Sequence, residues 1–129
     1  MIRLLAKIWA KLAYRFKLEK EAATNEINAA LSSKRAAEKR QLVEQLNAEA
    51  DAIQGNIAKE EETEEYKKLA GQEKYEADRE KNDAKKIVAD KRASAKTESE
   101  AVSEGEKTAQ YFRQLAANSR IVAEKIRRL

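Results

Sequence analysis

The chain contains no proline and only three glycines, Gly55, Gly71 and Gly105, in 129 residues. Proline is the residue that most reliably ends a helix, and an interior glycine weakens one by about 1 kcal/mol relative to alanine. Strong helix formers dominate instead, with 24 alanines and many lysines and glutamates. Neither a sustained alternation of apolar and polar residues nor a cluster of β-branched residues marks a strand. We therefore predict an all-α chain, with helix over most of its length and no strand.

The absence of cysteine and histidine excludes most kinds of reactive site. Disulfides, thiolate or imidazole metal sites, and Cys-His or Ser-His-Asp nucleophiles cannot form. Carboxylate pairs such as Glu61 with Glu65 have helical spacing, but they lack the apolar surroundings that a catalytic carboxylate needs. Glycine-rich phosphate loops are missing as well. We predict a protein that is not an enzyme and has no catalytic residue, no cofactor, no metal and no small-molecule substrate.

Residues 1–18 form a basic amphipathic segment with no acidic residue before Glu19. At 100° per residue, seven large apolar side chains fall within an arc of about a hundred degrees, here called the apolar arc: Met1, Ile2, Leu5, Ile8, Trp9, Leu12 and Phe16. A second line, the basic stripe, recurs every four residues and comprises Arg3, Lys7, Lys11 and Arg15. Such a helix can lie in a membrane interface, with its apolar face at the acyl boundary and its cations at anionic headgroups. The predicted membrane-binding residues are Ile2, Leu5, Lys7, Ile8, Trp9, Lys11, Leu12, Arg15 and Phe16.

Other kinds of segment share some of these features. The longest uncharged run before Lys20 is three residues, whereas a membrane span needs about 20 apolar residues and a secretory signal about 7–15. An organellar presequence is amphipathic, rich in arginine and poor in acids, but this segment lacks its usual serines. The segment could equally be the most apolar helix in the core of an oligomer. Lipid anchors are not expected, because Ile2 stands where myristoylation requires a glycine and no cysteine is present.

Residues 19–129 are predicted to form a long helical hairpin that turns near Gly71. The richest apolar clusters lie equally far from residues 71–72 on either side, so that Ile57 would face Ile87 and Leu42 would face Val102. The stretch around Gly71 holds few large apolar residues and the acidic run 60–65, which suits an exposed turn. Two helices of about fifty residues would measure about 75 Å. One unbroken helix is the alternative, since no proline obliges the chain to break.

We expect the hairpin to be a coiled coil that self-associates, because two thin helices have no third layer to cover a shared apolar stripe. Large apolar residues often recur at intervals of eleven, as in Leu31, Leu42 and Ile53, which favours a nearly straight or slightly right-handed bundle. The assembly could be a bundle, ring, tube or filament. The predicted core or oligomer residues are Leu31, Leu42, Leu46, Ile53, Ile57, Val88, Val102, Phe112, Leu115, Val122 and Ile126.

The net charge of +4 is unevenly distributed. Residues 1–20 carry six basic groups and one acid, and residues 113–129 carry five basic groups and one acid. The 92 residues between them carry 16 basic and 21 acidic groups, a net charge of −5. Each end can therefore meet an anionic surface, while the acidic centre opposes the binding of nucleic acid.

The layout of a short amphipathic helix followed by a long charged hairpin resembles that of phage-shock-protein-A-type membrane-remodelling proteins. Our leading hypothesis is a non-enzymatic, self-assembling structural protein that is cytoplasmic and peripheral to an anionic membrane. The alternative is a component of a virion or secretion apparatus, such as a scaffold, an internal or ejection protein, or a tube or filament subunit. A nucleic-acid-packing helix and a solvating stress protein of late-embryogenesis type are further alternatives. The nine large apolar residues in segment 1–18 fit the stress protein poorly.

Overall fold

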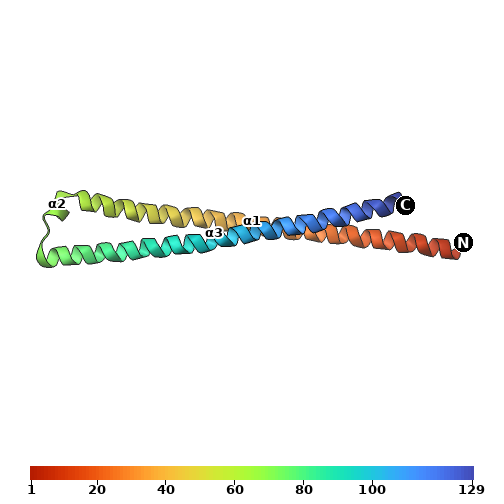
Figure 1. The fold of residues 1–129 in the computed structure, drawn as a ribbon, viewed down its shortest axis with the longest axis horizontal. Coiled ribbons are helices and arrows are strands. Elements are labelled where there is room, and N and C mark those ends of the chain that lie inside the picture. The colour runs from red at the N-terminus through yellow and green to blue at the C-terminus, as the bar shows by residue number, and fades with distance from the viewer. The chain divides into compact units, whose positions relative to one another are not determined.

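The computed structural model describes residues 1–129 and consists of helices and short connections only. The elements are α1 (Ile2–Glu62), α2 (Glu64–Lys67) and α3 (Gly71–Arg128), of 61, four and 58 residues (Figure 1). The prediction of an all-α chain without strands is confirmed. Residues 1–18 are the beginning of α1 rather than a separate helix, because no glycine or proline interrupts the chain between them and Gly55.

The chain reverses between α1 and α3 through the short helix α2. Thr63 begins this helix with extended backbone, and its hydroxyl oxygen accepts a hydrogen bond from the Tyr66 amide at 3.2 Å. The same hydroxyl donates to the Glu60 carbonyl at 2.7 Å, which ties the start of α2 to the end of α1. Gly71 begins α3 with φ at +62°, in the left-handed region that favours glycine. The turn therefore ends at Gly71, and the apolar clusters of the sequence lie at similar distances on either side of this residue.

The chain divides into two units, each an antiparallel pair of α1 and α3 segments. Unit 1 comprises residues 1–37 and 103–129, and unit 2 comprises residues 38–102 with the turn. Within unit 2, Lys91 pairs with Glu49 at 2.7 Å and Lys39 with Glu98 at 3.0 Å. Within unit 1, Arg120 pairs with Glu26 at 2.7 Å. The two members of each ion pair are separated from Gly71 by similar numbers of residues. The same pairing of α1 with α3 about Gly71 therefore holds within each unit.

Alanines at intervals of seven residues form most of the buried seam. Buried positions on α1 are Leu18, Ala22, Ala29, Ala36, Ala50 and Ile57, and on α3 they are Val88, Ala95, Val102, Ala109, Ala116 and Ala123. A seven-residue interval corresponds to 3.5 residues per turn. The eleven-residue intervals of the large apolar residues therefore do not describe the buried face. Alanine, the residue that mostly fills this seam, does not belong to the large apolar residues that recur at intervals of eleven.

The predicted core or oligomer residues occupy three kinds of environment. Ile57, Val88 and Val102 are buried in the seam. Five more are half-buried at its margins, namely Leu46, Ile53, Phe112, Leu115 and Ile126. Leu31, Leu42 and Val122 are exposed and lie outside the intrachain core. The accessible surface is 10060 Å², against about 6,900 Å² expected for a compact monomer of this mass.

Candidate membrane-interface site

The candidate site is built on the first four turns of α1, in unit 1. Leucine, alanine, lysine and arginine make up most of residues 3–18 and are all strong helix formers. Arg15 donates to the Glu19 carboxylate at 3.1 Å, an i, i+4 pair that supports the helix at the end of the segment. The segment is helical from Ile2 onward, so the apolar arc and the basic stripe are both present on its surface.

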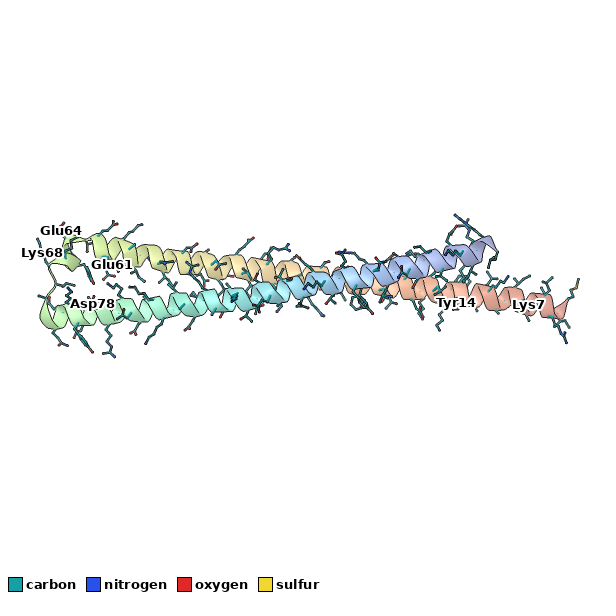
Figure 2. All side chains as sticks on the ribbon, in the orientation of Figure 1. Lys7, Tyr14, Glu61, Glu64, Lys68 and Asp78 are labelled. Atoms are coloured by element: carbon teal, nitrogen blue, oxygen red, sulfur yellow. The ribbon has the colours of Figure 1, made fainter.

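The apolar arc is exposed along its whole length. Trp9 is 71% exposed and Phe16 is 68% exposed, whereas Leu18, two residues further along, is 8% exposed. Of the nine predicted membrane-binding residues, Arg15 is half-buried and the other eight are exposed. Figure 2 shows Lys7 and Tyr14 on the part of α1 near its N-terminal end. The prediction that these residues contact a membrane stays a prediction, and the structure gives the surface on which it can be tested.

Two features account for this exposure: α3 ends at Arg128, beside residues 8–15 of α1, and the arc is rotated relative to the seam. At 100° per residue, the basic side chains Lys7, Lys11 and Arg15 lie on the same side of α1 as the buried Leu18. The apolar arc is rotated from that side by about 120°. Helix α3 therefore packs along the line that the basic stripe continues and leaves the apolar arc open. A helix that served only to extend the intrachain core would carry its large apolar residues on the side of Leu18 instead.

Most cations of the segment have no acidic partner. Arg3, Lys7 and Lys11 make no ion pair, and Arg15 alone is paired, with Glu19. The antiparallel arrangement adds the basic end of α3 to the same unit. Unit 1 holds 14 basic and six acidic side chains, a net charge of +8, and unit 2 holds 13 basic and 17 acidic side chains, a net charge of −4. The two basic ends of the sequence thus form one strongly basic unit.

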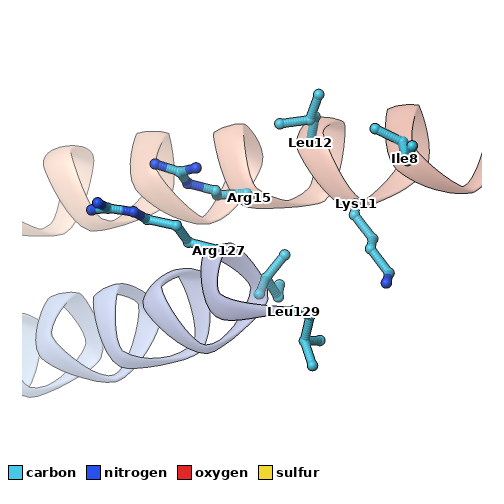
Figure 3. Close-up of a pocket in the computed structure, with 7 residues that line it drawn as sticks. Ile8, Lys11, Leu12, Arg15, Arg127 and Leu129 are labelled. Atoms are coloured by element: carbon cyan, nitrogen blue, oxygen red, sulfur yellow. The ribbon is translucent and has the colours of Figure 1, made fainter. Parts of the chain in front are cut away.

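A hollow of about 200 Å³, here called the end pocket, lies between α1 and the last residues of α3 (Figure 3). Its apolar lining comprises Ile8, Leu12, Ile126 and Leu129, and its basic lining comprises Lys11, Arg15 and Arg127. Arg127 also lies 3.7 Å from the Glu124 carboxylate. The pocket therefore joins one edge of the apolar arc, the basic stripe and the end of α3.

Sequence reasoning did not find Arg127 or Leu129 as parts of this site. A signal for Arg127 was present, since Arg113, Arg120 and Arg127 are spaced by seven residues along α3. In the structure, Arg113 donates to the Ser33 hydroxyl at 2.7 Å and Arg120 to the Glu26 carboxylate. Arg127 continues that line to the part of α1 that holds Arg15.

The ion pair of Glu26 and Arg120 fixes the register of unit 1 beside the site. The Arg120 guanidinium donates from Nε at 2.7 Å and from Nη2 at 2.8 Å to the two carboxylate oxygens. The hydrogen bonds and the charge of Arg120 lower the pKa of the Glu26 carboxyl below its usual value, and Glu26 in turn raises the pKa of Arg120. These two parallel hydrogen bonds favour one axial alignment of α3 with α1 near the end of α3.

A second cluster of polar groups lies at the turn and ties the three helices of unit 2 together. The Tyr66 hydroxyl of α2 donates to Asp78 of α3 at 2.5 Å, and Lys81 of α3 donates to the same hydroxyl at 2.9 Å. The Lys81 ammonium also pairs with Glu61 of α1 at 3.1 Å and lies 4.9 Å from the centre of the Tyr66 ring. Figure 2 places Glu61, Glu64, Lys68 and Asp78 around this turn. The hydrogen bonds that Lys81 donates to Tyr66 and Glu61 raise the pKa of Lys81, and the hydrogen bond that Tyr66 donates to Asp78 lowers the pKa of Asp78.

The turn cluster joins α1, α2 and α3 through its hydrogen bonds and ion pair. Its acceptors are satisfied by the donors beside them, and Tyr66 also lines an open hollow at the turn together with Leu69. The structure contains no group of three acidic side chains placed to hold a metal ion. None of the helices combines the length and the apolar character that crossing a membrane requires. No known protein family, no curated protein and no solved structure matches this chain.

Proposed function

We propose that this is a non-enzymatic helical structural protein that binds anionic membrane surfaces through the start of α1 and assembles with copies of itself. The observation that carries the proposal is the apolar arc of residues 1–16, which α3 leaves uncovered. Unpaired cations of the basic stripe border this arc. An apolar face beside unpaired cations is the arrangement that binds a membrane interface. Location at the cytoplasmic side of a membrane, as a peripheral protein, is part of the proposal.

The physical chemistry of the segment supports binding that is strong enough to measure. Each basic residue near an anionic leaflet contributes about 1 kcal/mol, and burial of apolar side chains adds to this. Trp9 and Tyr14 suit the headgroup boundary because each has an apolar ring and one polar atom. The attraction to headgroups weakens with salt, whereas the burial of the arc does not. Binding should therefore fall as salt is added but should not vanish.

Assembly is supported by the narrow alanine seam and by apolar residues outside it. The seven-residue interval of buried positions is that of a coiled coil. Leu31, Leu42 and Val122 remain exposed beside the seam, and contact with a second copy would remove them from water. The alternative, a component of a virion or secretion apparatus, uses the same arc as an assembly surface between subunits. Vesicle binding separates these two uses of the arc.

The decisive measurement is flotation of the full chain with vesicles. The chain should float with vesicles of phosphatidylcholine and phosphatidylglycerol, and the triple variant Leu5→Glu, Ile8→Glu, Leu12→Glu should stay in solution. A matched control replaces three exposed apolar residues elsewhere, Tyr75→Glu, Ile87→Glu and Ile121→Glu, and should float as the unaltered chain does. Circular dichroism should report the same helix content in all three proteins.

Two results would overturn the proposal. If the unaltered chain ignores anionic vesicles, the arc does not serve a membrane. If the triple variant also changes the molar mass of the assembly while the unaltered chain ignores vesicles, the arc is an assembly surface. The virion or secretion-apparatus alternative would then be favoured.

A further inference from the structure

The end pocket lies on the boundary between two chemically different surfaces of α1. Ile8 and Leu12 belong to the edge of the apolar arc, and Lys11 and Arg15 belong to the basic stripe. The end of α3 and the residue after it add two apolar side chains, Ile126 and Leu129, and one basic side chain, Arg127 (Figure 3). If the apolar arc lies at the acyl boundary of a leaflet, the cations of this pocket lie at the depth of the headgroups.

The charges around the pocket favour an anion. Lys11 makes no ion pair, so its ammonium is available. Arg15 is paired with Glu19 at 3.1 Å, and Arg127 shares the Glu124 carboxylate with Arg128, at 3.7 Å and 3.5 Å. Two side-chain carboxylates thus lie beside four basic side chains, and the side chains of the unit carry a net charge of +8. Guanidinium groups bind phosphate through paired N–H donors, and an ammonium adds a mobile point charge.

We propose that the end pocket binds one acidic phospholipid molecule. The guanidinium groups of Arg15 and Arg127 hold its phosphate group, and Lys11, whose side chain extends the other way in Figure 3, adds its charge at the same headgroup layer. Ile8, Leu12 and Leu129 contact the first methylenes of its acyl chains. This inference rests on the proposed membrane function and names the lipid class and the residues that select it.

The amphipathic lining is the reason for choosing a lipid over a soluble phosphate. A site for a free phosphate gains nothing from apolar side chains beside the cations, whereas a phospholipid carries charge and hydrocarbon next to each other. The volume of about 200 Å³ suits a headgroup and the start of its chains, and the rest of the chains would continue along the apolar arc. Because the lining comes from both helices, a bound lipid would also hold the end of α3 against α1.

The test is a titration of the isotopically labelled full chain, followed by nuclear magnetic resonance of backbone amides. The probe is a short-chain phosphatidylglycerol used below its micelle concentration. Short-chain phosphatidylcholine and inorganic phosphate are titrated in parallel. We expect saturable shifts at residues 8–15 and 126–129 with phosphatidylglycerol, and much weaker shifts with the other two probes. Equal responses to inorganic phosphate would overturn the lipid assignment, and the absence of shifts at residues 126–129 would overturn the pocket.

Paired variants separate this inference from the proposed function. Lys11→Gln with Arg127→Gln removes two charges from the pocket, one from each helix. Lys20→Gln with Lys125→Gln removes two charges from the same unit, also one from each helix, outside the pocket. The pocket variant should lose roughly tenfold more affinity for vesicles containing phosphatidylglycerol than the control, because it loses specific contacts as well as general attraction. Vesicle binding that is equal in the two variants would refute the pocket and leave the membrane function intact. Failure of the unaltered chain to bind any vesicle would refute both.

Discussion

At the scale of single residues, the fold depends mainly on alanine, whose side chain is a single methyl group. Eight of the twelve buried apolar residues are alanines, at intervals of seven along each helix. Alanine loses no side-chain entropy in a helix and lets two helices approach closely. It also buries little area, so each contact contributes little on its own. The pair of helices therefore depends on many small contacts in one register rather than on a few large anchors.

The three glycines allow a direct test of this account. Gly55→Ala should stabilise the chain by about 0.5–1 kcal/mol, because a Cβ there meets nothing within 4 Å and alanine is the better helix former. Gly105→Ala should also stabilise, since its Cβ would lie 3.4 Å from the Ala36 Cβ, an ordinary contact. Gly71→Ala should destabilise by about 1–2 kcal/mol because φ is positive there. Urea unfolding followed by circular dichroism measures all three, and a neutral Gly71→Ala would contradict the turn geometry.

At the scale of the elements, ion pairs between α1 and α3 set the register in each unit. Hydrogen bonds from Arg120 lower the pKa of Glu26, and hydrogen bonds from Lys91 and Gln45 lower the pKa of Glu49. A carboxyl whose folded pKa is lowered contributes stability above its unfolded pKa, near 4.5, and loses it as the pH falls through the folded pKa. Both pairs are on the surface, so salt weakens them.

The prediction for these pairs concerns acid conditions. The double variant Glu26→Gln, Glu49→Gln should be less stable than the unaltered chain at neutral pH, and this difference should shrink as the pH falls below about 4.5. Urea unfolding at a series of pH values measures this difference. The matched control is the double variant Glu38→Gln, Glu44→Gln, because neither of these glutamates forms an ion pair with α3. A difference that stays constant down to low pH would mean that the two carboxylates do not act through their charge.

The turn offers an element-scale prediction of its own. Tyr66→Phe removes the hydroxyl that joins Asp78 and Lys81, so α2 should lose its attachment to α3. We expect faster hydrogen exchange of the amides of residues 64–70, with little change in the rest of unit 2. Tyr75→Phe is the matched control, because the Tyr75 side chain is exposed and makes no hydrogen bond. Unchanged exchange in Tyr66→Phe would show that the Thr63 cap alone holds the turn.

Sequence patterns predicted the helices, and the predicted core or oligomer residues include three that lie in the buried seam, Ile57, Val88 and Val102. The absence of proline indicates long helices, and the symmetry of the apolar clusters about Gly71 indicates a hairpin. Both are strong signals because they involve residues along the whole chain. The buried face is hard to foresee from large side chains, because Ala29 and Ala36 are buried whereas the larger Leu31 and Leu42 are exposed. For the candidate site, the amphipathic start of α1 is visible in its periodicity. The contribution of Arg127 and Leu129 requires the register of α3, which no local pattern contains.

At the scale of the whole molecule, the antiparallel arrangement separates charge between the two units. Both basic ends of the sequence belong to unit 1, with a net charge of +8, while unit 2 has −4. An anionic surface attracts the first and repels the second, which gives unit 1 the contact with the surface. Between two copies, like units repel and unlike units attract, so the charges favour contact of unit 1 of one copy with unit 2 of another. In the proposed assembly, the apolar residues that the alanine seam leaves outside would supply the contacts between copies.

Self-association makes the stability of the whole molecule depend on its concentration. If copies bury Leu31, Leu42 and Val122 against one another, mass action favours the folded assembly, and the melting temperature should rise over a hundredfold increase in protein concentration. The variant Leu31→Glu, Leu42→Glu, Val122→Glu should show a smaller molar mass in light scattering and a melting temperature independent of concentration. It should still float with anionic vesicles, because the apolar arc is unchanged. A monomeric mass and a constant melting temperature for the unaltered chain would refute self-assembly, whereas loss of flotation in the variant would mean that membrane binding requires the assembled state.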